Sequence, residues 1–330
     1  MVPLNKLVFS RLRRVCSLKR LQSVVATLIL FTVLSQIPNE NELKSRKIRY
    51  DDSIESNTGI ENHHSNAFSR GNLSWLVSPE DFFGRLEGGH GRTPCRKLKS
   101  MGGQPCNRVV DGHKQLCLDT DVHINPRNCT VYSFGVSTEI TFDRAMAKYG
   151  CEVHMMDPTL PPGVYKNLGP KMKFHPVGLY SKSKIVAMNL TQYADWQGMI
   201  NSTLMTYSEV QQLLGHHAPV DYLKMDIENS EWVVLPHMMA RNQLAGIKQI
   251  AVEIHIDSSK FSKPEVTEYL RGRWSILEGL EEHGFRAAHY EPTRSLESEY
   301  KIPGTNRTIF TCGELFLVNK HHKDSNYHNL

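Results

Sequence analysis

The sequence lacks an excess of positive charge outside its first 20 residues. Those 20 residues carry six Lys and Arg and no acid, whereas the other 33 Lys and Arg residues are outnumbered by 34 Asp and Glu. A nucleic-acid partner requires a basic patch in the folded part of a protein. The composition therefore excludes nucleic acid as the expected partner and assigns the net charge of +5 to the N-terminal segment.

The sequence also lacks the cysteine spacing of a zinc site. None of its seven cysteines forms a C-x-x-C pair or a Cys/His pair with ligand spacing. Six of them follow the N-terminal segment: Cys95, Cys106, Cys117, Cys129, Cys151 and Cys312. In an oxidising compartment six cysteines permit three disulfides in fifteen connectivities, and the sequence does not choose among these.

The sequence has no internal repeat, and its long apolar run spans residues 21–37. Seventeen helical residues extend about 26 Å, which fits the thinner membranes of the early secretory pathway. The cations before this run, with none immediately after it, predict a cytosolic N-terminus. The alternative is a cleaved signal peptide, because Val33-Leu34-Ser35 is an acceptable cleavage site.

We therefore expect a single-pass type II membrane protein that faces the ER or Golgi lumen, or a secreted protein if the leader is cleaved. Its N-glycosylation acceptors agree with this: Asn72, Asn128, Asn189, Asn201 and Asn306. The predicted organisation is a cytosolic basic tail (1–20), a transmembrane signal-anchor (21–37), a polar stem or linker (38–72), a lumenal domain (73–320) and a polar tail (321–330).

Strand and helix signals alternate within the lumenal domain. Strands are predicted at 130–134, 152–156, 173–179, 222–227, 247–256, 285–290 and 314–318. Helices are predicted from a cap at Ser137 or Thr138 to Gly150, from the Thr206 capping box to Leu214, from about Ser230 past Pro236, and at 274–283. This alternation predicts an α/β fold with a mostly parallel sheet covered on both faces, in which the last two strands break the parallel order.

Polar residues gather at the carboxyl ends of these strands, where such sheets bind ligands. Gly135 ends the first strand, and Asp157 ends the second strand 22 residues later, the separation at which an acid commonly bonds a ribose hydroxyl. The stretch D-Y-L-K-M-D-I-E-N-S-E-W adds Lys224, Asp226 and Glu228. Each feature alone is compatible with a turn or a structural ion pair, but together they favour a nucleotide-like cofactor.

Two segments carry a resemblance to a known family: Y-S-F-G-V-S-T-E-I-T-F-D-R-A-M-A-K-Y-G-C-E-V-H-M-M-D-P and D-Y-L-K-M-D-I-E-N-S-E-W-V-V-L-P. They resemble methyltransferase-domain proteins of the methyltransferase-like 24 type, which are similar to FkbM-type O-methyltransferases. The resemblance covers about residues 80–320. It implies a class I, Rossmann-like three-layer sandwich that binds S-adenosylmethionine.

The same resemblance assigns roles to particular residues. Phe134 and Gly135 mark the cofactor loop, Asp157 is the ribose acid, and Asp226 stands beside the reacting methyl group. The usual loop has a second glycine where this sequence has Ser137. A small serine still allows a close backbone approach, and Glu139 is placed to meet the amino group of the cofactor. The alternative is a catalytically inactive interaction protein on the same fold.

Methyl transfer from a sulfonium requires an aligned acceptor and removal of the acceptor's proton. The candidate acid–base residues are Asp226, Glu228, Glu253 and His255, and His255 has the most suitable unperturbed pKa. Asp226 and Glu228 could instead hold a divalent cation that lowers the acceptor pKa.

The predicted function is S-adenosylmethionine-dependent O-methyl transfer to a glycan, protein, lipid or small molecule of the secretory pathway. A type II Golgi glycosyltransferase is a further alternative, because an anchor, a stem and a lumenal α/β domain also describe such enzymes. In that alternative the candidate metal-binding acids are Asp119 with Asp121 and Asp226 with Glu228.

Overall fold

The computed structural model describes residues 72–89, 93, 95–106, 109–160, 163–165, 167–189, 199–296 and 298–321. The predicted cytosolic tail, the signal-anchor, the stem up to residue 71 and the tail beyond residue 321 lie outside these residues. Within the described ranges, no helix is long and apolar enough to cross a bilayer.

A seven-stranded sheet forms the centre of the fold, in the order β11-β14-β10-β9-β3-β4-β5. Its strands are β3 (Thr130–Phe134), β4 (Glu152–Met156), β5 (Met172–His175), β9 (Tyr222–Met225), β10 (Gln249–His255), β11 (Phe285–Pro292) and β14 (Cys312–Asn319). Neighbours from β10 to β5 pair in parallel, and β14 runs antiparallel to both β10 and β11. The prediction of a Rossmann-like, mostly parallel sheet with a break at its last strands is confirmed.

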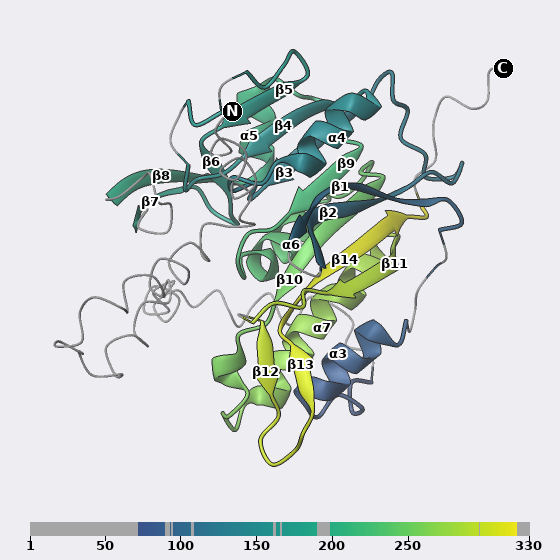
Figure 1. Ribbon diagram of the computed structural model, residues 1–330, viewed down its shortest axis with the longest axis vertical. Coiled ribbons are helices and arrows are strands. Elements are labelled where there is room, and N and C mark those ends of the chain that lie inside the picture. Colours follow the sequence, from purple (N-terminus) through teal and green to yellow (C-terminus); the bar gives the residue numbers. More distant parts are fainter. Residues whose placement is uncertain are drawn as a thin grey trace, which may run out of the picture. The chain divides into compact units, whose positions relative to one another are not determined.

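Two layers cover the sheet (Figure 1). The helices are α3 (Pro79–Glu87), α4 (Thr141–Tyr149), α5 (Tyr207–Leu214), α6 (Glu231–Ala240) and α7 (Val266–Glu282). One face packs against α4 and a hairpin of β1 (Leu98–Cys106) and β2 (Val109–Cys117), which bury Met146 and Leu116 against Val131. The other face packs against α3, α5, α6 and α7, where the buried residues include Trp232 and Leu223. The predicted three-layer arrangement is confirmed.

The β1–β2 hairpin was not predicted, and its glycines explain how it lies on α4. Gly102 has a φ of +74°, and a β-carbon there would lie 2.3 Å from the backbone nitrogen of Phe142. Gly103 donates its N–H to the hydroxyl oxygen of Thr141 at 2.6 Å. Because only glycine allows this approach, the hairpin can follow the start of α4 closely.

The prediction that Ser137 or Thr138 caps α4 is wrong. The helix begins at Thr141 with Ile140 as its N-cap, and no side chain bonds from the cap position. The carboxylate of Glu139 accepts the N–H of Thr141 at 2.8 Å instead. Capping rules consider local bonds, whereas the N–H of Ser137 has a distant partner, described below. The predicted helix end at Gly150 is confirmed.

Two other predicted elements have different bounds in the structure, and one predicted helix start is confirmed. The strand expected at 173–179 divides into β5 and β6 (Val177–Leu179), and β6 joins β7 (Lys184–Asn189) and β8 (Met199–Met205) in a separate sheet. Helix α7 begins at Val266, eight residues before the predicted start. Its first turns are only partly buried, so their sequence lacks the apolar pattern on which the prediction depended. The capping box of Thr206 and Glu209 is confirmed at the start of α5.

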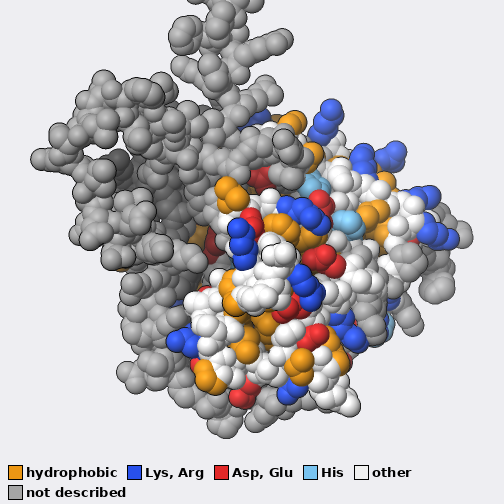
Figure 2. Space-filling view, turned by 60° about the horizontal axis from the view of Figure 1, so that its bottom comes forward, with side chains coloured by type: hydrophobic (Ala, Val, Ile, Leu, Met, Phe, Trp, Pro, Cys, Tyr) orange, Lys and Arg blue, Asp and Glu red, His pale blue; other side chains and the backbone are white. Residues whose placement is uncertain are grey.

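The fold also contains a small peripheral hairpin and a short helix. Strands β12 (Glu299–Lys301) and β13 (Thr308–Phe310) pair antiparallel, and the 3-10 helix η4 spans Ser258–Lys260. Figure 2 shows one face of the described surface, on which Lys and Arg side chains are interspersed with acids and apolar groups. No single basic patch gathers on the described part of that face.

Two disulfides join the described cysteines, Cys95–Cys117 and Cys129–Cys151. Cys312 is not in a disulfide, so the three bridges that six cysteines permit do not all form. Its position inside the central sheet, opposite His255 in the β10–β14 register, explains why it has no cysteine neighbour there. The side chain of Cys106 lies outside the described residues.

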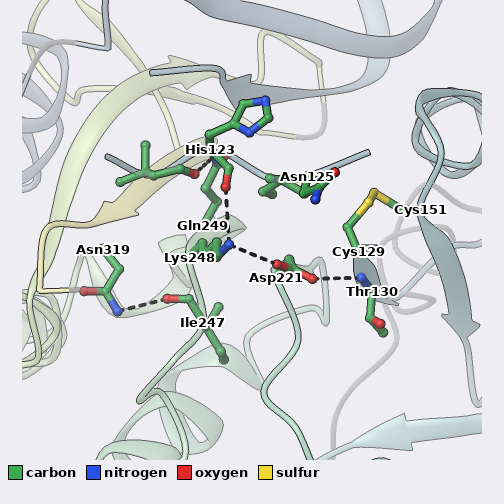
Figure 3. A network of polar contacts seen from close by, with 12 residues as sticks. His123, Asn125, Cys129, Thr130, Cys151, Asp221, Ile247, Lys248, Gln249 and Asn319 are labelled. Atoms are coloured by element: carbon green, nitrogen blue, oxygen red, sulfur yellow. Dashed lines mark hydrogen bonds and ion pairs between the residues drawn. A yellow bond between two sulfur atoms is a disulfide. The ribbon is translucent and has the colours of Figure 1, made fainter. Parts of the chain in front are cut away.

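A polar network fixes the amino ends of the parallel strands (Figure 3). Asp221 accepts the N–H of Thr130 at 2.9 Å and lies 3.5 Å from the ammonium of Lys248. Lys248 also donates to the carbonyl of His123 at 3.3 Å. Since the Cys129–Cys151 disulfide precedes β3 and β4 at the same end, this end is rigidly held. The carboxyl ends of the strands lie at the opposite edge of the sheet, outside this network, and are the ends where a ligand site is expected.

Candidate functional site

The carboxyl ends of β3 and β9 form a topological switch point. From β3 the chain runs outward to β4 and β5 and then returns to β9 on the other side of β3. Open α/β sheets bind ligands at such points. The N–H of Asp226, just after β9, donates to the carbonyl of Phe134 at 3.2 Å, which brings the two strand ends together.

The loop after β3 is held by Asp157. Ser137 has a φ of +48° in the left-handed region, and its N–H donates to Asp157 Oδ2 at 2.8 Å. Asp157 Oδ1 accepts the N–H and the hydroxyl of Thr159 at 2.8 and 2.6 Å. The hydroxyl of Tyr165 donates to the carbonyl of Ser137. Asp157 is only 4% exposed, so here it orders the loop, and its ribose role stays a prediction.

Glu139 serves the start of α4 in this structure. One of its oxygens accepts the N–H of Thr141, and a β-carbon on Gly112 would lie 1.9 Å from the other oxygen. The carboxylate is therefore enclosed between α4 and the hairpin. Burial raises its pKa above the ordinary value of a glutamate. The predicted contact of Glu139 with a cofactor amino group stays a prediction.

Lys224 connects the loop after β3 to Asp226. Its buried ammonium donates to the carbonyl of Gly135 at 2.6 Å and lies 3.6 Å from Asp226 Oδ2. Burial opposes ionisation of Asp226, but the charges of Lys224, Lys114 and His255 outweigh it and hold its pKa at about 2. Asp226 is therefore ionised throughout the physiological range.

Glu253, on β10, lies close enough to Asp226 for each carboxyl group to shift the pKa of the other. Its Oε1 also accepts the hydroxyl of Thr293 at 2.9 Å. Burial, together with the negative charges of Asp226 and Glu314, raises the pKa of Glu253 to about 8. At neutral pH Glu253 is therefore protonated while Asp226 is ionised, so the two neighbouring carboxyl groups hold one proton between them.

His255 ends β10 and is held by Glu231 from the first turn of α6. Its Nδ1 lies 3.2 Å from Glu231 Oε1, and the same oxygen accepts the backbone N–H of His255 at 2.8 Å. Burial disfavours the imidazolium, but the fully buried Glu231 outweighs this and raises the pKa of His255 well above 6.5. His255 is therefore cationic at neutral pH and does not accept a proton in this state.

Glu228 lies at the rim of the same cluster. It is 67% exposed, and its Oε2 lies 3.9 Å from His255 Nε2. Glu228 and Asn229 follow each other with φ values of +53° and +73°. Consecutive left-handed residues other than glycine are strained and concentrate at functional sites. The structure thus brings Asp226, Glu253 and His255 together and adds Glu228 at their edge.

Four residues of the cluster were missed by the sequence reasoning. Glu231 resembles an ordinary helix N-terminal acid, whereas Glu314 and Cys312 gave no signal beyond their strand. Lys114 comes from the unpredicted hairpin and contacts Glu314. Burial opposes its charge, but Glu314 and nearby acids raise its pKa. Burial also raises the pKa of the Cys312 thiol to about 12.

Two solved structures show a weak likeness to the fold. The FkbM methyltransferase of Methylobacillus flagellatus KT is 16% identical, with a TM-score of 0.32, over 57% of this chain and 44% of that one. The Aeropyrum pernix fibrillarin complex with S-adenosyl-L-methionine is 11% identical, also with a TM-score of 0.32, over 59% of this chain and 69% of that one.

Sequence relatives give the stronger evidence. The chain is 28% identical over 180 residues to the probable methyltransferase-like protein 24 of Homo sapiens and to that of Rattus norvegicus. The match takes in 53% of this chain and 47% of each relative, so the chain spans about half the length of the curated relatives it matches. A family model described as a methyltransferase domain matches residues 41–300. Because this match takes in most of the sequence, the chain belongs to the methyltransferase-domain family.

Proposed function

We propose that the protein is an S-adenosylmethionine-dependent methyltransferase that methylates an oxygen of its acceptor. The observation that carries this proposal is the position of Lys224, which bonds the carbonyl of Gly135 and pairs with Asp226. This arrangement places an ionised carboxylate beside the loop after β3, at the switch point of the sheet. A carboxylate there attracts a sulfonium cation.

The residues present fit such a cofactor. Gly135 leaves no side chain on the loop, and Ser137 adopts the left-handed conformation usually taken by glycine, so the second glycine is not needed for the turn. Gly135, Ser137 and Asp157 would hold the cofactor, which supplies an activated methyl group when bound. Both oxygens of Asp157 already accept hydrogen bonds within the protein, but an ionised carboxylate has about four acceptor sites, so one remains for a cofactor hydroxyl.

We assign the acceptor's proton to the Asp226–Glu253 pair. Asp226, the ionised member of the pair, orients the acceptor hydroxyl and accepts the proton that this hydroxyl loses as its oxygen takes the methyl group. Thr293 and Lys224 keep the two carboxyl groups in place. His255 is cationic and bound to Glu231, so it contributes positive charge rather than a proton acceptor.

We further propose that the protein acts in the secretory pathway as a single-pass type II membrane protein, or as a secreted protein if the leader is cleaved. The apolar run at 21–37 and the two disulfides support this. Four of the acceptor asparagines are exposed: Asn72, Asn128, Asn201 and Asn306. The acceptor belongs to the glycans, proteins, lipids or small molecules of that pathway, and the balance of 33 Lys and Arg against 34 acids after residue 20 disfavours a nucleic-acid partner.

Calorimetric titration of the full chain in detergent micelles tests the proposal. S-adenosylmethionine should bind with one site per chain, and Asp226→Asn should weaken this binding because a charge is lost. Asp121→Asn is the matched control, since Asp121 is an acid 53% exposed that pairs with Lys320 at the chain surface. Binding of sugar nucleotides alone would support the glycosyltransferase, and binding of neither ligand class would support the inactive alternative.

A further inference from the structure

Three potential metal ligands converge at the edge of the candidate site. Asp226, Glu228 and His255 each offer one ligand atom, and these atoms lie within 4.8 Å of one another. Ligand bonds of about 2.0–2.2 Å place neighbouring ligand atoms about 3–4 Å apart around one ion. The 3.9 Å between Glu228 Oε2 and His255 Nε2 already falls in this range. Small side-chain movements would therefore close the group on a single ion.

The orientation of His255 distinguishes this group from an ordinary cluster of surface acids. Its Nδ1 faces Glu231 Oε1 at 3.2 Å, and Glu231 is fully buried and also bonds the backbone N–H of His255. The side chain of His255 is 91% buried, and its Nε2 faces Glu228 beyond hydrogen-bond distance. In many metal sites a carboxylate accepts the N–H of the histidine nitrogen that does not bind the metal. This contact orients the ring and directs the other nitrogen at the ion.

We propose that Asp226, Glu228 and His255 bind a divalent transition-metal ion, with Glu231 orienting His255. Two carboxylate oxygens and one imidazole nitrogen suit ions such as Mn²⁺ or Zn²⁺, whereas Ca²⁺ and Mg²⁺ prefer sets made only of oxygen. Two carboxylates balance the charge of the ion. Three protein ligands leave coordination positions open, as in catalytic rather than structural sites.

Ion binding does not depend on methyl transfer, but its consequence for the reaction rests on the proposed function. An acceptor oxygen bound at an open position would lose its proton more readily, because a metal ion lowers the pKa of an oxygen it coordinates. The ion also takes the place of the proton on His255 Nε2, since a metal-bound imidazole is neutral. Binding is therefore measured at pH 8, where proton competition is weaker.

The test is a titration of the full chain, freed of metal by a chelator and held in detergent micelles, with Mn²⁺ followed by electron paramagnetic resonance. One Mn²⁺ should bind per chain, and Glu228→Gln should raise the dissociation constant at least about tenfold, equivalent to about 1.4 kcal/mol. Glu228 is exposed, so the variant should keep the melting temperature of the wild type. Asp226→Asn should weaken Mn²⁺ binding in the same way.

Glu291→Gln is the matched control. Glu291 is 48% exposed and lies 3.1 Å from His113 and 3.7 Å from His289, so it is another carboxylate beside histidines but outside the proposed ligand set. This variant should bind Mn²⁺ as the wild type does. Absence of Mn²⁺ binding in the wild type, equal affinity in Glu228→Gln, or a loss of affinity only in Glu291→Gln would each overturn the proposal.

A parallel titration of the same samples with S-adenosylmethionine separates the two proposals. If the protein binds the methyl donor but does not bind Mn²⁺, the metal site is overturned and the proposed function stands. Binding of Mn²⁺ without the donor, with the expected loss in Glu228→Gln, would support the metal site and count against the proposed function.

Discussion

The backbone oxygen of Asp226 occupies the space that a side chain at position 135 would need. A β-carbon on Gly135 would lie 1.7 Å from that oxygen, and Gly135 has a φ of +72°. Gly135→Ala should therefore lower the free energy of unfolding by about 2–4 kcal/mol, through left-handed strain and the clash together. Chemical denaturation measures this loss.

Gly215 supplies the control for that substitution. Its φ is +66°, and a β-carbon there would meet nothing within 4 Å. Gly215→Ala should cost about 1 kcal/mol, which isolates the conformational strain from the clash. Equal losses in the two variants would show that β3 and β9 separate easily at their ends, contrary to the structure.

Asp226→Asn should separate chemistry from stability at the site. The substitution preserves the size of the side chain but removes the charge next to Lys224. Methyl transfer should fall by about 10²–10⁴-fold, while the melting temperature changes little. Initial rates with a responsive acceptor and thermal unfolding are measured in parallel, with Asp121→Asn as the control. Normal turnover in the folded variant would move the proton-transfer role to Glu253 alone.

A histidine cluster on β4 and β5 should make the protein less stable in mild acid. His154 is 2% exposed, and its Nδ1 lies 3.1 Å from His175 Nε2. Burial and the nearby His216 lower the pKa of His154 to about 4, although Glu152 opposes this and Lys173 adds to it. The unfolded chain therefore binds the proton more tightly than the folded protein. The free energy of unfolding should fall by about 1–3 kcal/mol as the pH drops from 6.5 to 4.

Two variants test the origin of this acid sensitivity by urea unfolding at several pH values. His154→Gln removes the buried imidazole, so the free energy of unfolding should depend less on pH between 4 and 6.5. His217→Gln is the control, because His217 is exposed and should leave the pH dependence unchanged. A wild-type pH dependence in His154→Gln would assign the acid sensitivity to other groups.

The cysteines should separate into bridged and unbridged residues. Peptide mapping without reduction should find Cys95 linked to Cys117 and Cys129 linked to Cys151. Cys312 should react slowly with alkylating reagents until the protein unfolds, because burial raises its thiol pKa to about 12. Replacing Cys129 and Cys151 by serine should cost about 2–4 kcal/mol. Rapid alkylation of Cys312 in the native protein would contradict its burial in the sheet.

The exposed acceptor asparagines should carry glycans when the protein is made in cells. Asn128, Asn201 and Asn306 are exposed, and each Asn→Gln substitution should remove one glycan from the glycosidase-sensitive mass. Membranes washed in alkali should retain the protein if the anchor is uncleaved. A glycosylated but soluble product would support signal cleavage, and a mass unchanged by glycosidase would remove the lumenal assignment.

The central strands were predictable because the residues within each strand are themselves enough to indicate burial. Thr130–Phe134 and Glu152–Met156 are short apolar runs followed by Gly135 and Asp157, and the structure keeps these bounds. The β1–β2 hairpin was not predictable in this way. Its strands carry glycines and polar residues, such as Gly102 and Lys114, that are placed by contacts with α4 and β14. Strand preference of this kind depends on the partner surface.

The site was predictable in position but not in protonation. The period of a strand placed Glu253 and His255 on one face near the end of β10, and the structure brings both to Asp226. The unperturbed pKa of histidine suggested that His255 accepts a proton, whereas Glu231 makes it cationic. Glu231 is local in sequence to Asp226, but its full burial arises only from the packing of α6.

The position of β14 between β10 and β11 sets the order in which the sheet can be completed. Residues 312–319 are the last strand of the described chain, yet they pair with both neighbours. Until these residues leave the ribosome, β10 and β11 each present an unpaired edge that can recruit other chains. Closure of the sheet must therefore wait until residues 312–319 have been synthesised, after every candidate acid–base residue of the site.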